Sequence, residues 1–316
     1  MKHRTKIQIL GLGLALALSQ ASGAFASAGT VTVGKAPGET SALAETSAAQ
    51  TQAGQSTSGN VVTAGNSKVS DRPVVLPAAD GAAAEADIKQ PEVAAEGAVL
   101  LNAATGEVLY GKNQDQQFYP ASITKVMTAL VVLEHCNLND TVTFSKTATT
   151  NLESGAVALG VSEGDQLTVE QSLYGLLLKS ANEIGNGLAE HVSGSVSAFA
   201  DLMNTKAKEL GCKNTHFANP HGLNNENHKT TPYDMALILR AAVANDTFRR
   251  IDTTTSYEFP AIKNAGARTI TMGHKMMYKT DSRYYEGIIG GKTGYTSKAG
   301  NTLVTAVERD GVRFIV

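Results

Sequence analysis

The chain has 316 residues, of which 42% are hydrophobic, and a formal net charge of −2. That length allows one sizeable domain with additional material. The near-neutral charge argues against nucleic-acid binding, which usually requires a clustered excess of basic residues.

The first 26 residues have the features of an export signal. Basic side chains at Lys2, Arg4 and Lys6 precede the apolar run "IQILGLGLALAL", which is too short to span a bilayer comfortably, and "AFA" has the A-x-A form of a cleavage site. We predict a signal peptide over residues 1–26 and an exported, extracytoplasmic protein in the cell envelope or secreted. The alternative is a retained anchor helix. No later segment is apolar for long enough to cross a membrane, so no C-terminal membrane anchor is visible.

Residues 27–92 are dominated by Ala, Ser, Thr, Gly and Gln. Such a composition cannot bury enough apolar surface to offset the entropy of ordering. We therefore predict a low-complexity, disordered tether over 27–92, followed by one folded domain over 93–316.

The domain begins with strands and an apolar helix. "GAVLLNAATGEVLYGKN" predicts two strands around a turn at Thr105-Gly106, residues 121–135 predict an apolar helix, and "DTVTFS" alternates like a short strand. Cys136 follows this helix and Cys212 follows the end of a later one. We expect two separate, half-buried thiols, because nothing in the sequence brings them together and neither has metal-ligand spacing.

Helical patterns fill the middle of the domain. "TVEQSLYGLLLKSANEIGNGLAEHV" predicts two helices with a break at "KSAN", and Thr168 with Gln171 resembles a capping box. The amphipathic stretch "VSAFADLMNTKAKELG" ends at Gly211, a residue suited to the position after a helix. Thr231 before Pro232 predicts the start of another helix.

The last third returns to strands, in "YEF", "EGIIGGKTG", "NTLVTAVE" and "GVRFIV", with Asp310-Gly311 as a hairpin turn. Strands at both ends and helices between them predict an α/β (mixed) fold. Its antiparallel sheet would combine N- and C-terminal strands, flanked by helices and a helical lobe. Because the chain stops at Val316 within an apolar strand, we expect it to be truncated there.

Ser122 and Lys125 form the first candidate for chemistry. They lie three residues apart near a predicted helix start, so their side chains share one face. A serine hydroxyl needs a base to become a nucleophile, and an uncharged lysine amine can serve. The pKa of that lysine must fall by several units, through burial or a nearby cation, at about 1.4 kcal/mol per unit. By itself the pair is a weak signal, and an exposed helical lysine is the alternative.

Two further motifs strengthen the catalytic interpretation. "KSANE" contains Ser180-x-Asn182 at the break between helices, and "GGKTGYT" contains Lys292-Thr293-Gly294 at the end of a predicted strand. Penicillin-binding proteins and class A β-lactamases combine Ser-x-x-Lys, a Ser-x-Asn element and Lys-Thr-Gly in this way.

Long stretches also resemble the serine-type D-alanyl-D-alanine carboxypeptidases, the low-molecular-mass penicillin-binding proteins. They include "YPASITKVMTALVVLE", "LTVEQSLYGLLLKSANE", "AKELGCKNTHFANPHGL" and "GGKTGYTSKAGNTLV", and the similarity covers roughly residues 95–316. The resemblance implies a β-lactamase/transpeptidase-like fold and removal of the terminal D-alanine from peptidoglycan stem peptides through a serine acyl-enzyme. It also implies inhibition by β-lactams and no metal or other cofactor.

The resemblance implies a role for each motif residue. Ser122 would be the acylated nucleophile and Lys125 its general base. Ser180 would relay a proton to or from the leaving amine, while Asn182 would orient Lys125 and bind the substrate amide. Lys292 would help keep Lys125 uncharged and attract the terminal carboxylate of the substrate.

The resemblance also implies that substrate lies along the strand containing Lys-Thr-Gly. Thr293 would hydrogen-bond the carboxylate, and Gly294 would leave room for the substrate backbone. The backbone N–H groups of Ser122 and Tyr295 would form an oxyanion hole.

Two other functions remain open. A class A-like β-lactamase needs an E-x-x-x-N glutamate after the Ser-x-Asn element, and none of the glutamates from Glu183 to Glu308 has this spacing. A non-catalytic wall-binding module is the second alternative. Many family members also carry a further β-rich domain and an amphipathic membrane-binding helix, which this sequence does not show.

Other polar residues carry simpler expectations. His216 and His221 are expected to be structural, since the base role is filled by lysine and no metal-binding motif includes them. His274 is expected to line the cleft, and Glu183 to be a helix N-terminal charge without chemistry.

Overall fold

The computed structural model of the protein describes residues 90–150 and 152–316. The predicted signal peptide and residues 27–89 of the predicted tether lie outside this part of the chain. The described residues belong to one compact unit, so the fold below is that of the predicted domain.

The main sheet joins the two ends of the domain. Its strand order is β2-β1-β9-β8-β7, and every pairing is antiparallel. Because β1 pairs with β9, the prediction that the first and last strands meet is confirmed. The strands are β1 (Ala98–Asn102), β2 (Val108–Lys112), β7 (Ile288–Thr296), β8 (Gly300–Arg309) and β9 (Val312–Ile315).

Helices and two small antiparallel sheets occupy the sequence between β2 and β7. The two sheets pair β3 with β4 and β5 with β6. They consist of β3 (Thr141–Thr143), β4 (Gln166–Thr168), β5 (Ser256–Phe259) and β6 (Arg268–Thr271). The helices are η1 (Ala121–Thr124), α2 (Lys125–His135), α3 (Lys146–Thr150), α4 (Val169–Leu178), α5 (Asn182–Ser193), α6 (Val196–Glu209), α7 (Pro232–Ala242), α8 (Asp246–Asp252) and η2 (Lys275–Met277).

Local sequence signals account for several helix ends. Thr168 and Gln171 form the predicted capping box of α4, each side chain bonding the other residue's backbone N–H. Thr231 caps α7 with Pro232 at its first position. Gly211, two residues beyond α6, adopts φ +84°, where glycine is favoured. These predictions are confirmed, whereas β4, β6, α3 and α8 were not predicted.

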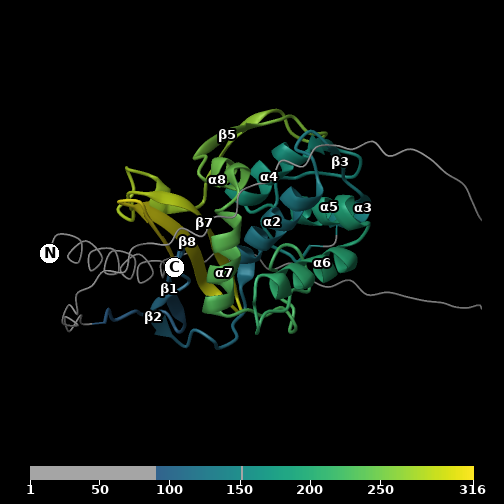
Figure 1. The fold of residues 1–316 in the computed structure, drawn as a ribbon. Coiled ribbons are helices and arrows are strands. Elements are labelled where there is room, and N and C mark those ends of the chain that lie inside the picture. Colours follow the sequence, from purple (N-terminus) through teal and green to yellow (C-terminus); the bar gives the residue numbers. More distant parts are fainter. Residues whose placement is uncertain (1–89, 151) are drawn as a thin grey trace, which may run out of the picture. The chain divides into compact units, whose positions relative to one another are not determined.

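Helix α2 runs through the core of the domain. Figure 1 shows it between the sheet side, where α7 lies, and the lobe formed by α3, α5 and α6. It contacts α4, α5, α6, α7 and α8, and its residues from Val126 to Val132 are buried. The 3-10 turn η1, which precedes α2 directly, packs against β7. This packing brings the Ser-x-x-Lys segment against the Lys-Thr-Gly strand.

Within residues 90–150 and 152–316, no helix combines the length and apolar character needed to span a bilayer. Cys136 and Cys212 are both free and partly buried, as predicted.

Candidate functional site

Ser122 lies in η1, directly before the lysine that starts α2. Its Oγ is 3.1 Å from the Nζ of Lys125. The preceding residue, Ala121, has φ +51°, an uncommon conformation for a residue with a side chain. The chain therefore turns sharply just before Ser122, and α2 then places Lys125 beneath the serine.

The partners of Lys125 define how its amine is oriented. Besides Ser122, Nζ contacts the Oδ1 of Asn182 at 2.8 Å and the backbone carbonyl of His221 at 2.7 Å. The Asn182 amide is fixed because its Nδ2 donates to the carbonyl of Val157. Both oxygens can only accept, so they take two N–H groups of the Lys125 side chain. When this amine is uncharged, its lone pair faces the Ser122 hydroxyl.

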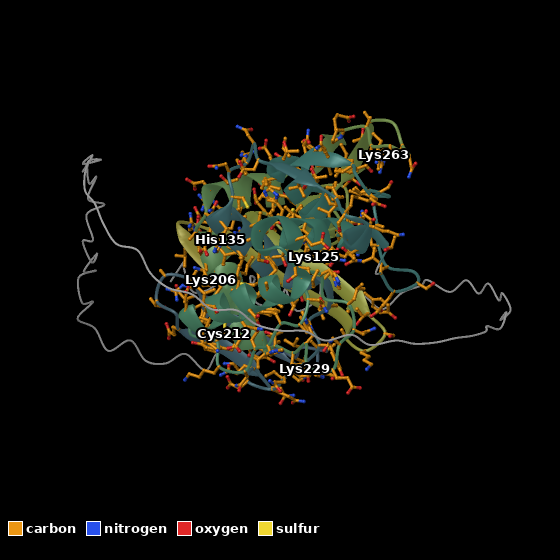
Figure 2. All side chains as sticks on the ribbon, turned by 90° about the vertical axis from the view of Figure 1, so that its right-hand side faces the viewer. Lys125, His135, Lys206, Cys212, Lys229 and Lys263 are labelled. Atoms are coloured by element: carbon orange, nitrogen blue, oxygen red, sulfur yellow. The ribbon has the colours of Figure 1, made fainter. Side chains whose placement is uncertain are left out.

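The surroundings of Lys125 favour that uncharged state. The side chain is 0% exposed, and Figure 2 shows it in the interior, whereas Lys229 and Lys263 lie near the edge of the domain. Burial lowers the pKa of Lys125 well below its usual value, and the charge of Lys292 lowers it further. Glu183 acts in the opposite direction but does not prevail.

Ser180 lies at the break between α4 and α5. It adopts φ +62°, and its Oγ is buried without a hydrogen-bond partner among the described residues. A strained backbone and an unpaired hydroxyl both carry an energetic cost, and such features cluster at functional sites. The Ser180 hydroxyl therefore remains available to a ligand.

Lys292 approaches the site from β7. It is 4% exposed, and its Nζ donates to the carbonyl of Thr293 at 2.9 Å. Burial lowers the pKa of Lys292 to about 8, while the neighbouring Asp252 raises it. Asp252 is itself 0% exposed, and its Oδ2 accepts the N–H of Gly291 at 2.5 Å. Burial raises the pKa of Asp252 to about 7, so this side chain on α8 supports the strand through Gly291 and supports the charge of Lys292 where it is itself ionised.

Gly294 allows β7 to lie against η1. A Cβ at this position would lie 2.7 Å from the backbone nitrogen of Ser122 and 2.5 Å from the Oγ1 of Thr302. The first contact is with backbone, which cannot move aside easily. A side chain here would therefore separate the strand from the nucleophile.

These elements surround one cavity of about 700 Å³. Every predicted site residue lines it except Lys125, which lies beneath Ser122 and contacts its hydroxyl. The predicted residues on the wall are Ser122, Ser180, Asn182, Lys292, Thr293, Gly294 and Tyr295. The structure thus brings together residues that the sequence separates by up to 173 positions, from Ser122 to Tyr295.

One expectation is wrong. His274 is not among the residues lining the cavity; its ring is buried against β8, with Nε2 at 3.2 Å from the Oγ1 of Thr305. Glu183 lies in the first turn of α5, as predicted, and it is 1% exposed. Its Oε1 accepts the backbone N–H groups of residues 159–161, whose donors compensate for its burial.

Three contributors were missed by sequence reasoning. They are the carbonyls of Val157 and His221 and the side chain of Asp252. A backbone carbonyl leaves no signature in side-chain identity, and Asp252 belongs to no motif. No local signal could have identified them.

One group of described residues away from the cavity has the chemistry to hold a metal ion. The donor atoms of Cys136, Asp140 and His191 lie within 4.8 Å of one another. Burial, followed by the charge of Asp140, raises the pKa of the Cys136 thiol, which favours its protonated form. None of the three residues lines the cavity, so this group takes no part in the chemistry there.

A serine beside a buried amine, opposite a buried lysine, is an arrangement suited to acyl transfer through a serine ester. The chain belongs to the D-alanyl-D-alanine carboxypeptidase family of serine peptidases, peptidase family S11, whose family model matches residues 84–316.

Curated relatives agree with this family. The chain is 34% identical over 226 residues to D-alanyl-D-alanine carboxypeptidase DacF of Bacillus subtilis, covering 70% of this chain and 56% of DacF. It is 37% identical over 228 residues to DacB2 of Mycobacterium tuberculosis, covering 72% and 75%. The chain thus spans little more than half the length of DacF.

Solved structures agree with the fold. The crystal structure of the Streptomyces K15 DD-transpeptidase is similar with a TM-score of 0.65 and 34% identity, covering 71% of this chain and 89% of that protein. A D-alanyl-D-alanine carboxypeptidase from Mycobacterium tuberculosis gives a TM-score of 0.64 and 36% identity, covering 71% and 82%. The predicted transpeptidase-like α/β fold is confirmed.

Proposed function

We propose that the domain removes the terminal D-alanine from peptidoglycan stem peptides through an acyl-enzyme on Ser122. The observation that carries this proposal is the orientation of Lys125. Asn182 and His221 accept two of its N–H groups and its Nζ lies 3.1 Å from the Ser122 Oγ, so the amine that its lowered pKa favours directs its lone pair to that hydroxyl. Membership of the family supports the substrate class.

Acylation begins when Lys125 takes the proton of Ser122. The Oγ then attacks the carbonyl carbon between the two D-alanines, and the N–H groups of Ser122 and Tyr295 stabilise the resulting oxyanion. When the C–N bond breaks, Ser180 passes a proton from Lys125 to the leaving amine. Water next attacks the ester and gives a proton to Lys125, which passes it to the Ser122 Oγ as the ester C–O bond breaks and the shortened peptide is released.

The strand β7 holds the end of the substrate. A protonated Lys292 attracts the terminal carboxylate, and the Thr293 hydroxyl donates a hydrogen bond to it. A β-lactam presents a carbonyl and a carboxylate in a similar relation, so it should acylate Ser122 and inhibit the enzyme. This function requires an exported protein. The predicted signal peptide over residues 1–26 would direct that export.

The test combines an adduct and a reaction. Penicillin-treated protein is digested and analysed by mass spectrometry, and release of D-alanine is measured from a peptide ending in D-Ala-D-Ala, with a D-Ala-L-Ala peptide as control. We expect a long-lived adduct on Ser122 and release from the first peptide only. Rapid hydrolysis of nitrocefin would instead indicate a β-lactamase. Absence of both adduct and release would indicate a wall-binding module.

A further inference from the structure

The peptide group between Ala121 and Ser122 has two functional ends. Its N–H belongs to the nucleophile and is one of the proposed oxyanion donors, while its carbonyl belongs to Ala121. A peptide group is planar and trans, so its N–H and C=O point in opposite directions. Any contact that fixes the Ala121 carbonyl therefore also fixes the direction of the Ser122 N–H.

The Ala121 carbonyl is held by a buried hydroxyl. Thr124 is 0% exposed, and its Oγ1 donates to the carbonyl oxygen of Ala121 at 2.8 Å. The same Oγ1 lies 2.8 Å from the Nε2 of His228. Since the Thr124 proton is committed to the carbonyl, His228 must donate at this second contact.

The other nitrogen of His228 agrees with this assignment. Its Nδ1 accepts the backbone N–H of Ala218 at 3.0 Å, so it carries no proton. Burial, with smaller contributions from His216 and Lys125, lowers the pKa of His228 to about 3. The ring is thus neutral with its proton on Nε2. The hydrogen bonds from Ala218 through His228 and Thr124 to the Ala121 carbonyl therefore all run in the same direction.

The loop at Gly222 packs closely against the Ala121 carbonyl. Gly222 adopts φ +89°, and a Cβ there would lie 1.8 Å from the Ala121 carbonyl oxygen and 2.9 Å from the Oγ1 of Thr124. The Ala121 conformation, at φ +51°, is itself strained. Such strain persists only where surrounding contacts impose it, and the contacts made by Thr124 and His228 provide this constraint.

We propose that His228 and Thr124 are positioning residues that fix the Ala121–Ser122 peptide and so direct the Ser122 N–H into the oxyanion hole. This inference rests on the proposed acyl-enzyme function. Neither side chain lines the cavity. They act before substrate binds, by removing the reorientation that the N–H would otherwise need as negative charge develops on the substrate oxygen.

A matched set of substitutions tests the hydrogen bonds from His228 to Thr124 and from Thr124 to Ala121 separately. Thr124→Ser keeps the hydroxyl, whereas Thr124→Val removes it with little change in shape. His228→Gln keeps a donor near the Nε2 position, whereas His228→Asn keeps an acceptor near the Nδ1 position and loses the donor to Thr124. His135→Asn makes the same change at an exposed histidine at the far end of α2 and serves as control.

The measurement separates binding from acylation. Time courses with penicillin give the noncovalent dissociation constant, the acylation rate constant and the fraction of protein that reacts. We expect Thr124→Val and His228→Asn to lower the acylation rate constant about 10-fold, part of the roughly 100-fold or greater effect of losing a whole oxyanion donor. The noncovalent constant should stay unchanged, because the oxyanion forms only in the transition state.

A second readout uses a peptidyl boronic acid, whose tetrahedral adduct with serine places an oxygen in the oxyanion hole. Its affinity should fall about 10-fold in the same two variants, in proportion to the acylation rate. Thr124→Ser and His135→Asn should match the wild-type protein, and His228→Gln should lie between the extremes.

The outcomes distinguish this inference from the proposed function. If the wild-type protein reacts but Thr124→Val and His228→Asn keep its rate constant and boronate affinity, the positioning role is wrong. If those variants only lower the fraction of reactive protein, they affect folding and the positioning role is again wrong. If the wild-type protein does not react with penicillin at all, the proposed function itself fails.

Discussion

Lys125 on α2 and Lys292 on β7 are both buried at the same site, but their surroundings differ. Lys125 contacts neutral oxygens, whereas Lys292 is close to the carboxylate of Asp252. Glu183 is the acid that raises the pKa of Lys125, and its carboxylate accepts the backbone N–H groups of residues 159–161. Burial lowers the pKa of both lysines, to about 8 for Lys292, whereas the charge of Lys292 lowers the pKa of Lys125 further, so Lys125 is the lysine expected to be uncharged at neutral pH.

This difference predicts a window of pH for activity. Lys125 works only when uncharged, so the rate should rise as pH passes through its lowered pKa. Lys292 binds the carboxylate only when charged, so activity should fall as pH rises through its pKa of about 8. The pH profile of kcat/KM should therefore be bell-shaped, with one lysine on each limb.

The largest effect is expected from Lys125→Arg. A guanidinium stays charged at neutral pH and cannot accept the Ser122 proton. Acylation by penicillin should fall by at least about 1000-fold, near the loss that removing a base of this kind causes. The measurement is the rate of adduct formation by mass spectrometry, with the exposed Lys263→Arg as control. A covalent adduct formed at the wild-type rate would exclude Lys125 as the base.

Asp252→Asn should have an intermediate effect. An asparagine oxygen can still accept the Gly291 N–H, but the negative charge beside Lys292 is gone. The pKa of Lys292 should fall, and the alkaline limb of the kcat/KM profile should move to lower pH by about one unit. KM for a carboxylate substrate should rise more than kcat falls, since the charge of Lys292 acts in binding.

The pH profile of kcat/KM for Lys292→Gln provides the comparison for Asp252→Asn. The Lys292→Gln profile should lack the alkaline limb altogether. An Asp252→Asn profile that coincides with the wild-type profile would show that the carboxylate does not support Lys292.

Glu183→Gln should have the smallest effect. Removing the charge takes away the influence that raises the pKa of Lys125, so the acidic limb should move to lower pH. The remaining amide oxygen can still accept the N–H groups of residues 159–161, so the free energy of unfolding should change by no more than about 1 kcal/mol. Acylation rates across pH, together with urea denaturation, test both points.

The sequence predicted much of the site because its motifs lie at the ends of regular elements. The Ser-x-x-Lys spacing places two side chains on one helix face, and the break at Ser180 is a point where two helical patterns meet. Lys292 to Tyr295 belong to a predicted strand with several glycines, and glycines within a strand often mark a place where another backbone or a ligand approaches closely. These features depend on local chemistry, which is why the residues could be identified before their mutual contacts were known.

The remainder depends on packing between distant segments. Asp252 supports Lys292 only because α8 packs against β7, and His221 contributes a carbonyl that any residue could provide. The burial of Glu183 follows from the loop that folds over it, and His274 turns toward β8 instead of the cavity. No periodicity or local motif carries this information.

The central claim is that one buried lysine is uncharged while its neighbour is charged. The most direct test is NMR of protein labelled with ¹⁵N at the lysine side chains, with Lys125→Arg and Lys292→Arg used to assign the two signals. At neutral pH the account predicts an amine signal for Lys125 and an ammonium signal for Lys292, with the latter titrating near pH 8. A Lys125 signal that remains ammonium until pH values well above 8 would contradict the account.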